Sequence, residues 1–167
     1  MLSRLFYPLS VISLLAVFSL PALAAGNNGE SDDVIKVVYH ADFADPRRYS
    51  AMLTSINNMV TYYKNQLVDY DVRIVFVSYG IRFLTNDKLE NTPFKSDVKL
   101  EEQRDNLRGR LNSLNTVQGV KLELCDITRS QIGLPEDKLY KDVKLVPSGV
   151  ARLAELQHQG FAYLKIE

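Results

Sequence analysis

Cys125 is the only cysteine of the chain, and it lies between two predicted elements. The apolar run 119–124 before it predicts a strand, and the segment 126–134 after it predicts a short helix. A thiol at a strand-to-helix turn lies near the positive end of the helix dipole, which stabilises the thiolate and makes the sulfur nucleophilic. We therefore expect an accessible and reactive thiol at position 125.

The residues that follow Cys125 act on its pKa in opposite directions. Arg129, one helical turn further on, favours the thiolate through its charge, and Thr128 can donate a hydrogen bond to it. Asp126 opposes them, because an adjacent carboxylate raises the pKa of a thiol. We expect the helix start and Arg129 to outweigh Asp126. The alternative is a buried and inert cysteine that packs as a small apolar side chain.

Three further positions are candidates for a site. His40 follows the strand-like run 34–39 and is a candidate base or ligand-orienting group; the alternative is a histidine satisfied by a local backbone hydrogen bond. Ser148 and Gly149 open a predicted helix, where backbone N–H groups can bind an anion, although Ser148 can also serve simply as the helix cap. Gly80 ends another strand-like run and can take positive φ.

The order of the predicted elements indicates the fold class. Apolar, β-branched runs predict strands at 34–39, 72–77, 120–124, 143–146 and 161–166. Apolar residues at helical spacing predict helices at 49–67, 100–114 and 150–159, with Gly109 weakening the second of them and a loop at 82–94. Alternating strands and helices are typical of a three-layer α/β/α fold with a mainly parallel five-stranded sheet. Ligands of such sheets bind at the carboxyl ends of the strands, so we expect His40, Gly80, Cys125 and Ser148 to converge there.

The first residues predict export. Arg4 is the only charged residue before an uncharged apolar stretch, and Ala22 and Ala24 form the small-residue pattern of a signal peptidase site. We expect a signal peptide at 1–24, a flexible polar tether at 25–33 and one domain at 34–167. The protein would then be periplasmic or secreted, with no membrane contact after cleavage. The alternative is an uncleaved anchor, because the apolar stretch approaches the roughly 20 residues that span a bilayer.

The charge balance and the metal-binding residue types exclude several classes of partner. The chain has 20 basic and 20 acidic residues, which argues against a nucleic-acid partner. Two histidines and one cysteine have no metal-ligand spacing, and no phosphate-binding loop or nucleophile elbow is present in the sequence. We therefore expect no metal and no cofactor.

Four segments resemble the DsrE/DsrF-like family. They are VVYH at 37–40, SYGI at 78–81, GVKLELCDITRSQIGL at 119–134 and VPSGVARLAELQHQGFAYLKI at 146–166. The resemblance extends from Val34 to Ile166 and is most specific in the last block. It implies that Cys125 occupies the position of the cysteine that carries persulfide sulfur between partner proteins, and that the chain forms homo-oligomers. Relay members of that family work in the cytoplasm, whereas this chain is predicted to be exported.

Our functional prediction is an exported protein that carries or senses sulfur through Cys125, with a thiol or persulfide donor or acceptor as partner, rather than a stand-alone enzyme. The alternative is a non-catalytic, homo-oligomeric module for a small anionic ligand or for assembly. A monothiol oxidoreductase is disfavoured, because a lone thiol has no resolving partner within the chain. Apolar side chains on the helix 100–114 and the last strand predict a trimer or a dimer of trimers.

Overall fold

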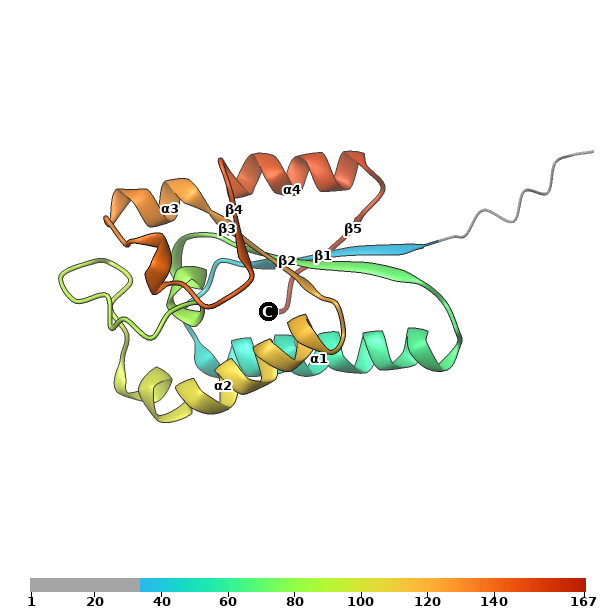
Figure 1. The fold of residues 1–167 in the computed structure, drawn as a ribbon, viewed down its shortest axis with the longest axis horizontal. Helices are drawn as coiled ribbons and strands as arrows, with labels where there is room; N and C mark the ends of the chain where they lie inside the picture. Colours follow the sequence, from blue (N-terminus) through green and yellow to red (C-terminus); the bar gives the residue numbers. More distant parts are fainter. Residues whose placement is uncertain (1–33) are drawn as a thin grey trace, which may run out of the picture. The chain divides into compact units, whose positions relative to one another are not determined.

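The computed structural model describes residues 34–167, which form a parallel five-stranded sheet in the order β4-β3-β2-β1-β5 (Figure 1). The strands are β1 (Ile35–Ala41), β2 (Tyr70–Phe76), β3 (Lys121–Cys125), β4 (Val143–Val146) and β5 (Ala162–Leu164). The predicted three-layer α/β/α class with a mainly parallel five-stranded sheet is confirmed. The predicted signal peptide and tether lie outside the described residues.

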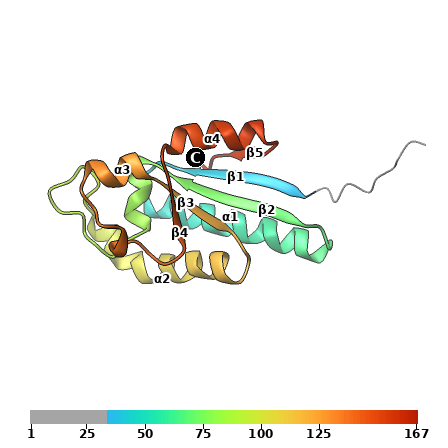
Figure 2. The same ribbon diagram turned by 45° about the horizontal axis from the view of Figure 1, so that its top comes forward.

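Helices cover both faces of this sheet, as Figures 1 and 2 show. The helices are α1 (Pro46–Asn65), α2 (Val98–Thr116), α3 (Asp126–Gln131) and α4 (Gly149–His158), with 3-10 turns η1 (Ser78–Phe83) and η2 (Glu136–Lys138). α1 and α2 pack side by side on one face, α4 lies on the other, and α3 follows directly from the carboxyl end of β3. Within residues 34–167, no helix is both long enough and apolar enough to cross a membrane.

The two faces of the sheet are packed very differently. The α1/α2 face holds the large core, which includes the fully buried Tyr49, Phe76 and Leu111. The α4 face holds a small apolar cluster of buried residues, namely Val38, Val75, Leu153, Leu156 and Phe161. Because successive side chains of a strand point to opposite faces, Lys121, Glu123 and Cys125 of β3 all lie on the sparsely packed α4 face.

Each long helix begins at a side-chain cap. Asp45 accepts a hydrogen bond from Arg47 N (2.7 Å) at the start of α1, and Asp97 accepts one from Leu100 N (3.0 Å) at the start of α2. Ser148 caps α4 by accepting a bond from Ala151 N (3.3 Å). Such caps satisfy N–H groups that have no partner within the helix, so they fix the residue at which the helix starts.

Gly80 has a different role from the predicted one. The positive φ of this turn belongs to Ser78 (φ 52), not to the glycine. A Cβ added at Gly80 would lie 2.1 Å from the carbonyl oxygen of Ala41 in β1. Gly80 is therefore required by the close approach of η1 to the backbone of β1, and it is buried in that contact.

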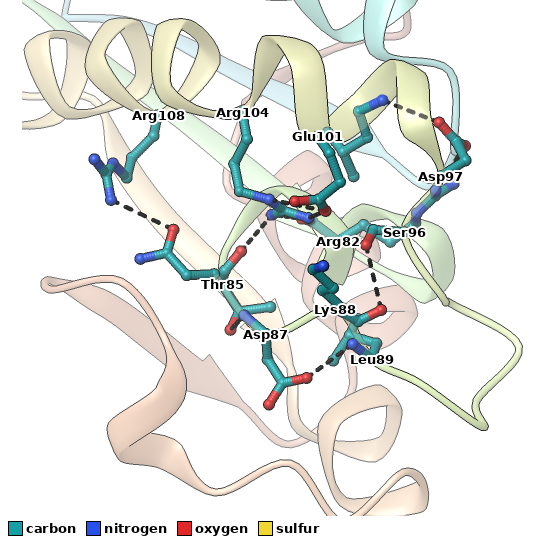
Figure 3. A network of polar contacts seen from close by, with 12 residues as sticks. Arg82, Thr85, Asp87, Lys88, Leu89, Ser96, Asp97, Glu101, Arg104 and Arg108 are labelled. Carbon is teal, nitrogen blue, oxygen red and sulfur yellow. Dashed lines mark hydrogen bonds and ion pairs between the residues drawn. The ribbon is translucent and has the colours of Figure 1, made fainter.

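The first residues of the predicted loop at 82–94, residues 82–85, are buried and held by two arginines (Figure 3). Arg104 of α2 donates to the carbonyls of Arg82 (3.0 Å) and Thr85 (2.5 Å) and pairs with Glu101 (2.6 Å). The guanidinium of Arg82 pairs with Asp97 (2.7 Å). Buried carbonyls that receive charged donors are costly to expose, so this loop is fixed against α2.

Candidate functional site

Cys125 is the last residue of β3 and immediately precedes α3. Its thiol is free, and only 4% of the residue is exposed. The expectation of an accessible thiol is therefore wrong for the single chain. The reason is that Val146 of β4 pairs beside it while the first turn of α4 closes over it from the face of the sheet.

Backbone and hydroxyl groups of the first turns of α3 and α4 nevertheless act on the pKa of Cys125. Burial raises the pKa of Cys125, but the N–H groups of Gly149, Thr128 and Ile127 and the Thr128 hydroxyl lower it, so that its pKa lies below the ordinary value of a thiol. These donors come from the first turns of α3 and α4. They stabilise a sulfur anion without contact with a cationic side chain.

Thr128 is held in place by the chain after β2. Its hydroxyl oxygen accepts a hydrogen bond from the N–H of Ser78 (3.1 Å), and the residue is buried. Since that oxygen accepts from Ser78, its own proton is free to point at the sulfur. Ser78, whose N–H orients Thr128, is thus also a residue with positive φ.

Gly149 leaves room for the sulfur. A Cβ at this position would lie 2.9 Å from Cys125 Cβ, 3.6 Å from Cys125 Sγ and 2.6 Å from a methyl of Val77. The absence of a side chain lets the helix start approach the thiol closely. Ser148, the neighbouring residue, uses its hydroxyl as the helix cap.

Arg129 is directed away from the thiol. Its guanidinium pairs with Asp126 (2.6 Å) and donates to the carbonyl of Leu134 (2.7 Å). The two side chains that were expected to act on the thiol in opposite directions bind each other instead. The groups that lower the pKa of Cys125 are the N–H groups of Gly149, Thr128 and Ile127 and the Thr128 hydroxyl.

His40 belongs to a separate cluster, because β2 lies between its strand and β3. Its Nδ1 is 2.9 Å from the hydroxyl of Tyr163, and its Nε2 is 3.8 Å from Asp42, which pairs in turn with Lys165 (2.9 Å). Burial lowers the pKa of His40, and Asp42 opposes that shift. Among the polar contacts of residues 34–167, none joins His40 to Cys125. Two strand spacings, about 9–10 Å, separate β1 from β3.

A buried ion-pair network near the thiol was missed in the sequence. Glu123, only 2% exposed, accepts two hydrogen bonds from Arg152 of α4 (2.7 and 3.1 Å) and one from Arg73 of β2 (2.9 Å). Arg73 also pairs with Asp71 (2.7 Å). The signal available was a glutamate in the middle of an apolar strand, which requires a cationic partner when it is buried.

The metal-binding capacity of the chain and a groove near β4 also bear on what the site can bind. In the described part of the chain, no group of three or more His, Cys, Asp and Glu side chains could hold a metal ion. A groove of about 260 Å³ runs along β4 and the first turns of α4, lined by residues that include Val146, Ser148 and Arg152. Val146 is the sheet partner of Cys125, but Cys125 itself does not line this groove.

Comparison with known proteins identifies the family. The DsrE/DsrF-like family matches residues 32–166. A protein of unknown function, MTH1491 from Methanobacterium thermoautotrophicum, is 26% identical with a TM-score of 0.60, covering 78% of this chain and 98% of its own. The ychN protein from E. coli shares the fold at 18% identity and a TM-score of 0.53, covering 79% and 99%. No curated protein matches the chain. The chain therefore belongs to the DsrE/DsrF-like family.

Proposed function

We propose that this protein is an exported sulfur carrier or sensor that holds a sulfur atom on Cys125. The observation that carries the proposal is the position of Cys125 between β3 and α3 with the start of α4 close to its sulfur, where N–H groups of both helix starts lower the pKa of a thiol that burial alone would raise. A thiolate is the nucleophilic form of cysteine, so this environment favours reaction over inert packing. The apolar stretch and the small residues of positions 1–24 support export.

The chemical step is a transfer of one sulfane sulfur from a persulfide donor. The Cys125 thiolate attacks the terminal sulfur of the donor, and a new S–S bond forms at Cys125. The S–S bond of the donor breaks, and its inner sulfur leaves as a thiolate with the electron pair of that bond. The proton stays on the transferred sulfur, and no external oxidant or reductant is needed. Discharge to an acceptor thiolate is the same step in reverse.

The burial of Cys125 restricts the donor. Because 4% of the residue is exposed, a bulky disulfide cannot align with the sulfur, whereas a terminal sulfane atom projects beyond its carrier. The groove along β4 and α4 offers room of about 260 Å³ next to Val146. A low-molecular-weight persulfide, or a persulfide on an extended protein segment, fits this geometry.

Loading with cysteine persulfide tests the proposal. The purified protein is expected to gain the mass of one sulfur atom, and dithiothreitol is expected to remove it, because a persulfide is reducible. Cys125→Ser is the matched control and should gain nothing. Intact-mass spectrometry makes both measurements. If the parent protein gains no more mass than Cys125→Ser does, Cys125 is an incidental cysteine and the assembly-module alternative takes its place.

We also propose that the protein is a homo-oligomer, a trimer or a dimer of trimers. Apolar side chains are exposed at both ends of α2, where Val98 and Val117 are 72% and 67% exposed, and on β5, at Tyr163 and Leu164. Exposed apolar groups of this kind favour symmetric association. Light scattering at micromolar concentration is expected to give a mass of three or six chains; the mass of a single chain would contradict it.

A further inference from the structure

We infer that Arg152 is a positioning residue for Cys125: its salt bridge to Glu123 holds the first turn of α4 over the sulfur. The proposal concerns how the thiol environment is assembled. It rests on the proposed function only in taking Cys125 as the reactive group, and it assigns a role to a network that none of the features above explains.

The network joins the two elements that meet at the sulfur. Glu123 lies two residues before Cys125 on the same face of β3, and Arg152 lies three residues after Gly149, one turn along α4. Arg152 Nε donates to Glu123 Oε2 (2.7 Å) and Arg152 Nη2 to Glu123 Oε1 (3.1 Å). A two-point contact of this kind fixes both distance and orientation, so it sets where the N–H of Gly149 points.

Glu123 is itself held rigidly. Arg73 donates to its Oε1 (2.9 Å) and is fixed in turn by Asp71 (2.7 Å) and by the ring of Phe161, 5.0 Å away. Arg73 and Glu123 come from neighbouring strands, β2 and β3. The carboxylate that receives Arg152 is therefore part of the sheet, which makes it a fixed point for the helix to bind.

Apolar packing alone does not fix the position of α4 on the sheet. Only Leu153 and Leu156 of this helix belong to the small buried cluster on its face of the sheet. Non-directional contacts of a few aliphatic side chains permit a helix to slide or rotate by a fraction of an ångström. A hydrogen bond to sulfur is sensitive to such a shift, whereas a buried bidentate ion pair resists it.

The test is a pH titration of the Cys125 thiolate, followed by its ultraviolet absorbance with Cys125→Ser as the blank. Arg152→Met keeps the aliphatic stem and removes the contact. It is expected to raise the midpoint by about 1 pH unit, the size expected when one hydrogen bond to a charged sulfur is lost. Arg152→Lys keeps the charge but not the two-point contact and should give an intermediate midpoint. This second variant also serves if Arg152→Met does not fold.

Lys121→Met is the matched control. Lys121 lies on the same face of β3 and pairs with Asp71 at the outer end of the network. The substitution therefore removes one positive charge without changing a contact of α4. Its midpoint should stay within about 0.3 pH unit of the parent. An equal shift in Lys121→Met, or no shift in folded Arg152 variants, overturns the positioning role. An ordinary thiol midpoint in the parent protein would instead overturn the proposed function.

Discussion

Gly149→Ala is expected to raise the pKa of the Cys125 thiol and to slow its alkylation by about tenfold at neutral pH. The added Cβ would lie 2.6 Å from Val77 and 2.9 Å from Cys125 Cβ, so the start of α4 must move away from β3. That movement withdraws the N–H of Gly149 from the sulfur and raises the pKa of the thiol by about 1 unit.

The rate of reaction with iodoacetamide as a function of pH measures this effect. Gly109→Ala is the matched control, because Gly109 is a helical glycine with nothing within 4 Å of an added Cβ. It should leave the rate unchanged and stabilise α2 by about 0.5–1 kcal/mol. An unchanged pH profile in Gly149→Ala would show that the N–H groups of α4 do not govern the thiol.

Gly80→Ala is expected to cause the largest loss of stability, about 3 kcal/mol in the free energy of unfolding or more. An added Cβ would lie 2.1 Å from Ala41 O and 3.1 Å from Ala41 C. That oxygen also accepts the N–H of Val77 (2.9 Å), so neither β1 nor the turn after β2 can shift freely. Backbone atoms, unlike the end of a flexible side chain, have no alternative rotamer to adopt.

Urea denaturation followed by circular dichroism gives the comparison. Gly133→Ala separates the clash from the strain of an unusual backbone, since Gly133 has φ +64 but open space around it. The control should lose about 1 kcal/mol, the ordinary cost of a side chain in the left-handed region. Equal losses in the two variants would mean that the contact with Ala41 is not what requires a glycine at position 80.

The fold could be predicted from the sequence because each element carries a local signal. Parallel strands that are buried on both faces are apolar at nearly every position, as in VIKVVY before His40, and the helices repeat at their own spacing. Gly109 did not interrupt α2, because Leu107 and Leu111 are buried on the opposite side and outweigh the propensity of one residue. The hydrophobic pattern of the sequence therefore predicts these strands and helices, and the packing of the folded chain is consistent with it.

The thiol site could be located but not described. Position 125 follows from the strand-to-helix transition, whereas the burial of Cys125 depends on α4, which is more than twenty residues away in the chain. Arg129 looked like a partner of the thiol because helical spacing brings it near, but the same spacing brings Asp126 within 2.6 Å of it. Glu123 and Arg152 meet only through the folded sheet, so no local pattern reveals their pairing.

The central claim is tested most directly by the intact mass of the protein isolated from its native host. The claim is that this thiol holds a transferable sulfur in the protein as its native host makes it. Intact-mass spectrometry of the isolated protein, with and without dithiothreitol, is expected to show a fraction heavier by one sulfur atom that disappears on reduction and is absent from Cys125→Ser. The account would be contradicted by a single unmodified mass both with and without dithiothreitol, if the protein also gains no sulfur from cysteine persulfide.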